Sequence, residues 1–324
     1  MTTLFRRLHM PPLDGATAWL NSEPLDPAGL RGKVVLVDFW TLTCINWLRT
    51  EPWIRAWSRA YRDDGLVVIG VHTPEFGFEH DLDLVRQAVR ERGIDHPVAI
   101  DNGYRVWRAF DNHYWPALYF VDAQGRIRHH HFGEGEYEGS EMVLQMLLRE
   151  ADRDVDQGLV RIEPGGAEAQ ADWATLGSPE TYLGYGRAVG FASPGDFVPD
   201  EAHGYAAPPA LRRNEWALSG QWRVGLVPAI LGEAGGTVSF QFHARDLHLV
   251  MGPRRGQPPV RFQVRLDGGR PGPAHGIDVD EDGNGTAEFQ RMYQLIRQPP
   301  PIGDRRLDVE FLDAGVEVFV FTFG

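Results

Sequence analysis

Two strongly apolar runs on either side of a helical segment constrain the fold of the amino-terminal half of this chain. Residues 33–40 and 66–71 have the near-continuous apolar character of strands that are buried on both faces, which is typical of parallel sheets. Residues 47–61 between them have helical periodicity, and Pro52 predicts a kink in that helix. A strand, a helix and a second strand in this order predict a β-α-β unit with a right-handed crossover.

The segments that follow extend this unit into an α/β domain, which we expect to have a central mixed sheet with helices on both faces. Their apolar periodicity alternates between the strand and helix patterns as far as residue 150. Strands are predicted over 97–100, 115–121 and 126–132, and helices over 81–92, 102–110 and 141–150, the last of them capped by Ser140.

A change of texture divides the 324-residue chain into two domains, which its length also allows. Residues 1–152 form the α/β domain, and the polar stretch 153–174 is predicted to be a linker. Residues 175–324 contain short strand-like runs that are separated by turn residues at fairly regular intervals. This pattern is typical of a β-sandwich, and we expect an antiparallel sandwich of jelly-roll type.

The composition excludes two classes of partner and suggests a compartment. A net charge of −13 repels phosphate backbones and anionic lipids, so nucleic acids and membrane surfaces are not expected partners. The sequence has no apolar run of about 18 residues that would span a membrane. Residues 1–11 lack the apolar stretch of a signal peptide. The cytoplasm is therefore the predicted location.

The one cysteine of the chain, Cys44, lies between the first predicted strand and the first predicted helix. A helix amino terminus favours a thiolate, which lowers the pKa of a thiol and makes its sulfur nucleophilic. Asp38 lies six residues earlier within the apolar strand, where burial should raise the pKa of its carboxyl group. Such a carboxyl group can exchange a proton with a nearby thiol. The alternative is a packed, inert cysteine, which is common for this residue type.

Two sequence motifs around Cys44 carry a resemblance to a known superfamily. Residues 37–44, VDFWTLTC, resemble the segment V-D-F-W-x-x-x-C of the thioredoxin superfamily. Trp115 and Pro116 stand where that superfamily has an X–Pro bond, which is cis and faces the catalytic sulfur. Residues 40–50, WTLTCINWLRT, are similar to W-T-x-T-C-I-N-C-L-R-T of TlpA-like redoxins, above all the soluble part of DipZ-type proteins.

The resemblance covers both domains, because DipZ-type proteins continue with a β-sandwich that resembles a carbohydrate-binding module. It implies a thioredoxin fold with antioxidant or oxidoreductase chemistry and no organic cofactor. It also implies that Cys44 is the nucleophile, Asp38 the proton shuttle and Pro116 the backbone platform for a bound disulfide or peptide. Related domains lie outside the cytoplasmic membrane, which is at odds with the location predicted from composition.

The chain departs from the family motif at position 47, where a tryptophan replaces the second cysteine. Trp47 cannot resolve a mixed disulfide formed by Cys44. Three functions stay open: disulfide exchange through Cys44 with an external thiol, peroxide reduction through a Cys44 sulfenic acid, and a binding protein without redox turnover. Thr41 has the spacing from Cys44 that peroxiredoxins use, but Val37 stands in place of their proline. We favour thiol-dependent oxidoreductase chemistry with a disulfide or thiol partner.

Six residues near these motifs are expected to line the site. Two tryptophans on motif positions are expected to flank the sulfur as an aromatic collar, and Trp47 either joins them or packs into the core. The expected lining residues are Trp40, Thr41, Thr43, Asn46, Trp47 and Trp115.

No metal site is predicted, although two segments resemble one. His129 and His131 can share a face of a strand, but two ligands do not make a site. Residues 278–283 begin like a calcium loop, but Phe289 stands where its closing glutamate would be, so a solvated acidic turn is favoured. A glycan partner of the second domain would need exposed aromatic rings, and the alternative is that these rings pack in the core. The candidates are Trp216, Trp222 and Tyr293.

Overall fold

The computed structural model describes residues 9–155 and 158–324, which form two compact units. The first unit runs to Ala169 and the second begins at Gln170, so the division falls inside the predicted linker. None of the helices in the described residues has the length and apolar character needed to cross a bilayer.

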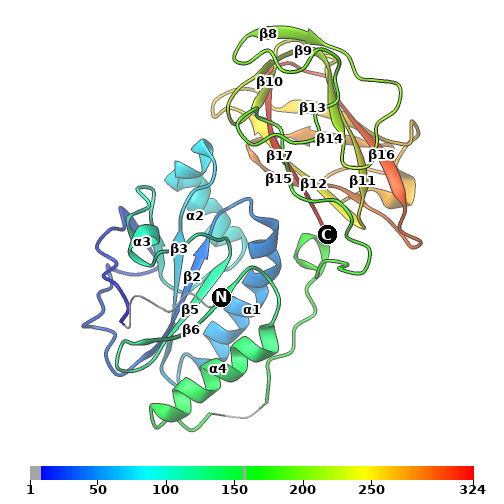
Figure 1. The fold of residues 1–324 in the computed structure, drawn as a ribbon. Helices are drawn as coiled ribbons and strands as arrows, with labels where there is room; N and C mark the ends of the chain where they lie inside the picture. Colours follow the sequence, from blue (N-terminus) through cyan, green and yellow to red (C-terminus); the bar gives the residue numbers. More distant parts are fainter. Residues whose placement is uncertain (1–8, 156–157) are drawn as a thin grey trace. The chain divides into compact units, whose positions relative to one another are not determined.

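The first unit is built around a mixed sheet to which the described residues contribute six strands (Figure 1). Strand β2 is central, pairs in parallel with β3 and pairs antiparallel with β5, and the strand order is β1-β4-β3-β2-β5-β6. This order confirms the predicted mixed sheet. The strands are β1 (Ala18–Leu20), β2 (Val34–Trp40), β3 (Leu66–His72), β4 (Val98–Ile100), β5 (Ala117–Val121) and β6 (Ile127–Phe132).

Helices cover both faces of this sheet, as predicted (Figure 1). Apolar side chains of α1 and α4 pack with Leu36 and Phe120 on one face, and those around α3 pack with Phe39 and Tyr119 on the other. The helices are α1 (Ile45–Tyr61), α2 (Leu82–Glu91), α3 (Arg105–Ala109) and α4 (Tyr137–Glu150), with a short 3-10 turn η1 (Gly77–His80) before α2.

The start of α4 corrects one prediction. The helix is capped by Glu136, which has a left-handed backbone with φ 52°, and not by Ser140. Ser140 lies in the first turn of the helix and is buried. The ring of Tyr137 stacks on Trp53 of α1, with ring centroids 4.8 Å apart. This packing favours an earlier helix start than the local capping preference of serine indicates.

The first part of the predicted linker packs against the first unit. Val160 donates its backbone N–H to the Glu141 carboxylate, and Gln145 donates to the carbonyl oxygen of Gly158, both at 2.9 Å. Val155 is buried in an apolar cluster with residues of α1 and α4. A second 3-10 turn, η2 (Gly166–Glu168), ends this segment.

The second unit is one continuous, curled antiparallel sheet and not two separate sheets. Its two halves face each other across a shared core, because Phe240 of β11 contacts Phe321 and Phe323 of β17, which are not neighbours in the sheet. In the described residues the main path of the sheet is β14-β13-β16-β11-β9-β10-β17-β12-β15, with β7 beside β17 and β8 beside β9.

The strands of this sheet confirm the short strand-like runs predicted for residues 175–324. The strands are β7 (Thr181–Tyr182), β8 (Ala202–Tyr205), β9 (Trp216–Val224), β10 (Ala229–Leu231), β11 (Thr237–His243), β12 (Asp246–Pro253), β13 (Val260–Leu266), β14 (Asn284–Ala287), β15 (Arg291–Arg297), β16 (Asp304–Phe311) and β17 (Val316–Phe323).

Candidate active site around Cys44

The Cys44 thiol lies at the amino terminus of α1, directly after the central strand β2. Cys44 is the N-cap residue of this helix and is partly exposed. Its thiol faces the carbonyl oxygen of Trp115, with Sγ 3.7 Å from that oxygen. The next peptide bond, from Trp115 to Pro116, is cis. Antiparallel pairing of Phe39 with Ala117 brings this loop to the end of β2. The structure thus brings Cys44, Trp115 and Pro116 together.

Asp38 is buried in β2, and its carboxylate oxygen Oδ2 accepts a hydrogen bond from the indole N–H of Trp47 at 3.0 Å. Burial is the largest cause of a rise in the pKa of Asp38 to about 7. The hydrogen bond from Trp47 lowers this pKa and the nearby Glu51 raises it, both by smaller amounts. The predicted effect of burial on this carboxyl group is therefore confirmed, whereas proton exchange with Cys44 stays a prediction.

Trp40 and Trp47 are interior residues. Each is 1% exposed, and their rings stack with centroids 4.3 Å apart and an angle of 18° between the planes. His72, at the end of β3, contacts Trp40 edge to face at 4.7 Å. The guanidinium group of Arg92 lies 5.7 Å from the ring centroid of Trp47. Trp47 therefore packs into the core, which was the second of its two predicted placements, and it does not cover the thiol with an exposed ring.

Trp115 is held by the loop that follows β3. Its indole N–H donates to the carbonyl oxygen of Thr73 at 3.1 Å, and its ring lies 4.4 Å from that of Trp107. These contacts fix the carbonyl of Trp115 beside Cys44 and turn its ring toward α3.

Asn46 is in the first turn of α1, where its carbonyl oxygen accepts from the hydroxyl of Thr50.

Sequence analysis missed Glu79, which organises the backbone before Cys44. This buried carboxylate accepts from both the N–H and the hydroxyl of Thr43, at 3.1 and 2.8 Å. It also accepts from the N–H groups of Glu75 and Phe76, at 2.6 and 2.8 Å. Burial raises the pKa of Glu79, and the hydrogen bonds from Phe76 and Thr43 oppose that rise. The sequence feature that could have indicated this role is an acidic residue that follows two phenylalanines in the segment 76–79.

Thr41 serves the same loop and is fully buried. Its hydroxyl accepts from the N–H of Glu75 at 3.3 Å, and the hydrogen bond that the Thr41 side chain donates to Glu79 lowers the pKa of Glu79. This arrangement commits Thr41 to the loop after β3. The peroxiredoxin-like spacing of Thr41 and Cys44 therefore has a structural explanation that does not involve peroxide.

The three aromatic residues that were candidates for sugar binding lie in the core of the second unit. Trp216, Trp222 and Tyr293 are fully buried, and each donates to a backbone carbonyl oxygen, of Val189, Ser219 and Phe289 respectively. The curl of the sheet turns these side chains inward, so core packing, the alternative given above, is correct.

The acidic turn at 278–283 is engaged by neighbouring protein groups. Asp278 accepts from the guanidinium group of Arg291 and from the backbone N–H of Gln294, both at 2.7 Å. Asp280 accepts from the backbone and side chain of Asn284. These contacts favour the predicted acidic turn over a calcium loop.

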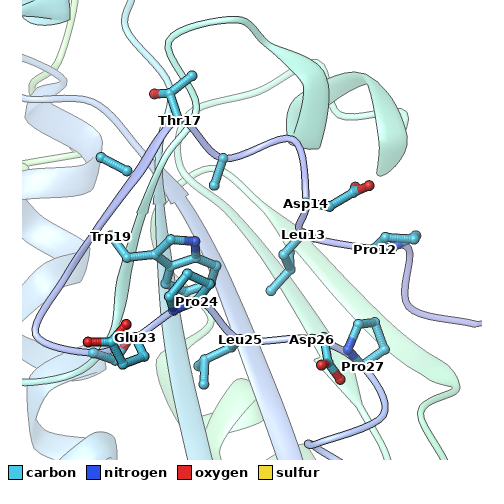
Figure 2. A pocket seen from close by; sticks show the side chains of 13 residues that line it. Pro12, Leu13, Asp14, Thr17, Trp19, Glu23, Pro24, Leu25, Asp26 and Pro27 are labelled. Atoms are coloured by element: carbon cyan, nitrogen blue, oxygen red, sulfur yellow. The ribbon is translucent and has the colours of Figure 1, made fainter.

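A hollow of about 610 Å³ lies in the first unit but does not belong to the Cys44 site (Figure 2). It is formed by residues 12–27, with Trp19 beside Pro24, and Leu13 and Leu25 nearby. Neither Cys44 nor any of the residues around it described above is among its lining residues.

Comparison with known proteins extends over both units. Residues 178–324 match the family described as "Thioredoxin like C-terminal domain". Protein DipZ of Mycobacterium tuberculosis is 39% identical over 247 residues, which are 75% of this chain and 35% of that protein. The chain thus spans about a third of the length of the DipZ relatives it matches.

Two further similarities each cover a little less than half of the chain. The thiol-disulfide oxidoreductase YkuV of Bacillus subtilis is 30% identical over 146 residues, which are 45% of this chain and 98% of that protein. The solution structure of a thioredoxin-like protein in its oxidized form aligns with a TM-score of 0.42 and 31% identity, over 44% of this chain and 97% of that one. Because YkuV is matched over nearly its whole length, this chain belongs to the thioredoxin-like superfamily.

Proposed function

We propose that this protein is a thiol-disulfide oxidoreductase that works through a single thiol. The observation that carries this proposal is the placement of Cys44, which is partly exposed at the start of α1 and faces the Trp115 carbonyl beside Pro116. Trp47, which replaces the resolving cysteine, is buried and leaves the sulfur uncovered. The similarity to YkuV, a thiol-disulfide oxidoreductase by name, supports the same chemistry.

The proposed reaction is a two-step exchange. The Cys44 thiolate attacks one sulfur of a disulfide R–S–S–R′, so that a Cys44–S–S–R bond forms and R′–S⁻ leaves and takes a proton from water. A second thiol R″–SH, as its thiolate, then attacks the R sulfur, which releases Cys44 and yields R–S–S–R″. The external thiol thus does the work of the resolving cysteine, which Trp47 cannot do. Such a thiol is abundant in a reducing compartment, which accords with the predicted cytoplasmic location.

The first test is the rate of Cys44 alkylation by iodoacetamide as a function of pH, followed by intact mass. We expect a midpoint well below the free-thiol value of about 8.5, because the helix amino terminus favours the thiolate. The Cys44→Ser variant is the control and should gain no mass. Slow alkylation with an ordinary or raised midpoint would rule out the exchange mechanism and favour a binding protein.

A second candidate role, ligand binding by the second unit, rests on a polar hollow of about 270 Å³. Its walls come from outward-facing residues of β11, β13 and β16, including Ser239, Arg265, Arg306 and Asp308. The ligand would be a small polar molecule, bound by hydrogen bonds and not by ring stacking. Broadening of these residues' NMR signals on adding neutral oligosaccharides would support a glycan ligand, which the resemblance to DipZ-type proteins suggested, and unchanged signals would argue against it.

A further inference from the structure

The carboxyl group of Asp38 is committed to Trp47. Asp38 is 1% exposed, and Oδ2 accepts from the Trp47 indole N–H at 3.0 Å. The other oxygen, Oδ1, has no hydrogen-bond partner among the described residues. A buried carboxyl group with one neutral donor is costly to ionise, so this position needs an explanation.

Trp47 is held by three separate contacts. Trp40 stacks on its ring at 4.3 Å, the Arg92 guanidinium lies 5.7 Å from the ring centroid, and Asp38 fixes the indole N–H. Trp47 is in the first turn of α1, three residues after Cys44. Fixing its ring therefore fixes the turn of helix on which the sulfur sits.

The charged groups around this cluster do not supply Asp38 with a counter-charge. Glu51 of α1 is buried and raises the pKa of Asp38. Arg92, after α2, is 3.4 Å from the Glu168 carboxylate of η2. His72 of β3 is kept neutral, because burial lowers its pKa to about 3. The indole N–H is thus the group that holds the Asp38 carboxyl in place.

We propose that Asp38 is a positioning residue, which holds Trp47 and through it the first turn of α1, and that it exchanges no proton with Cys44. This inference rests on the proposed function, because it concerns how the reactive thiol is held. It predicts that an uncharged acceptor of the same shape serves equally well. An asparagine provides such an acceptor through its side-chain oxygen but cannot exchange a proton at these pH values.

The test compares the variants Asp38→Asn and Asp38→Ala in a single-turnover reaction of the full chain with the disulfide DTNB. Cys44 forms a mixed disulfide with one half of DTNB, and the other half leaves as a coloured thiolate. We expect Asp38→Asn to keep at least half of the rate with an unshifted pH midpoint. We expect Asp38→Ala to lose about tenfold, since it removes the acceptor of the indole N–H. A large loss or a shifted midpoint in Asp38→Asn would show proton exchange and overturn the inference, and an unaffected Asp38→Ala would overturn it too.

The indole N–H resonance of Trp47 provides a readout that does not depend on reactivity. It is assigned as the signal that disappears in Trp47→Phe. We expect slow hydrogen exchange of this signal in the wild type and in Asp38→Asn, and fast exchange in Asp38→Ala. In the wild type the signal should titrate with a midpoint near 7, and in Asp38→Asn it should not.

The two readouts separate the possible failures. If wild-type Cys44 does not react with DTNB, the proposed function fails while the resonance still tests the hold on Trp47. Fast exchange in Asp38→Asn would overturn the inference even where the function stands. If Asp38→Ala does not fold, the retained rate, unshifted midpoint and protected signal of Asp38→Asn decide.

Discussion

Two carboxylates buried near α1 differ from those buried in the second unit. In the first unit, Asp38 and Glu51 are each 1% exposed, and burial raises the pKa of each to about 7. Among the described residues, neither Glu51 oxygen has a hydrogen-bond partner, and Arg55 lies 3.5 Å from Oε2 of Glu51. In the second unit, Asp246 pairs with the Arg245 guanidinium at 2.7 Å, and Glu317 is bonded by an arginine and a glutamine side chain.

This difference distinguishes buried carboxyl groups that stabilise the fold from buried carboxyl groups that lie near a reactive site. Buried carboxylates that accept several hydrogen bonds leave few unsatisfied atoms, whereas a buried carboxyl group with few donors lowers the stability of the native state. Such groups with perturbed pKa values gather at functional sites. The position of Asp38 and Glu51 on β2 and α1, which flank Cys44, agrees with the chemistry proposed for the first unit.

The largest expected effect comes from emptying a buried tryptophan site in either unit. Trp47→Ala and Trp222→Ala should each lower the free energy of unfolding by about 3–5 kcal/mol, because both rings are fully buried. Hydrogen exchange read by mass spectrometry should localise each loss to its own unit. Only Trp47→Ala should also slow the reaction of Cys44 with DTNB. Equal slowing of the DTNB reaction by both variants would contradict the difference between the two units.

Replacing a buried aspartate by asparagine should have opposite signs in the two units. The unfolded-state Asp38 loses its proton near pH 4 and the folded-state Asp38 near pH 7, so the stability present below pH 4 is lost as the pH rises through 7. At pH 8, Asp38→Asn should therefore raise the free energy of unfolding, by an upper bound of about 4 kcal/mol. Asp246→Asn should lower it by about 1–3 kcal/mol, because it breaks a buried ion pair. Guanidinium unfolding at pH 4 and pH 8 checks both signs, and the Asp38→Asn gain should vanish at pH 4.

A smaller effect is expected from His72. Burial lowers the pKa of His72 to about 3. Between pH 6.5 and pH 3, His72 therefore binds a proton in the unfolded state but not in the folded state. The first unit should therefore lose stability as the pH falls, by about 2 kcal/mol at pH 5. His72→Leu should remove this dependence. An equally steep acid limb in the variant would place the proton uptake elsewhere.

Local patterns sufficed for the elements that carry the reactive cysteine. The runs 33–40, 47–61 and 66–71 correspond to β2, α1 and β3, because apolar periodicity and β-α-β handedness are local or generic properties. The helix begins two residues earlier than predicted, at Ile45, and this makes Cys44 its N-cap. The position of Pro116 facing Cys44 was expected only from the resemblance to the thioredoxin superfamily.

Contacts between distant segments decided what the patterns left open. Glu79 reaches Thr43 across 36 positions, and no spacing rule links the two residues. Trp47 had two possible placements until the positions of Trp40 and Arg92 were known. Trp222 could be exposed or buried by its sequence alone, and the curl of the sheet decides that its ring faces inward.

Because the chain has a single cysteine, the disulfides of Cys44 identify the molecules with which the protein has reacted. Cys44 has no second cysteine thiol within its own chain, so any disulfide it forms joins the protein to another molecule. Each oxidised form other than the oxygen acids is thus an adduct with a mass of its own, and its partner stays attached until a thiol removes it. Mass spectra of the protein taken from its native setting, without reductant, would therefore display its partners directly.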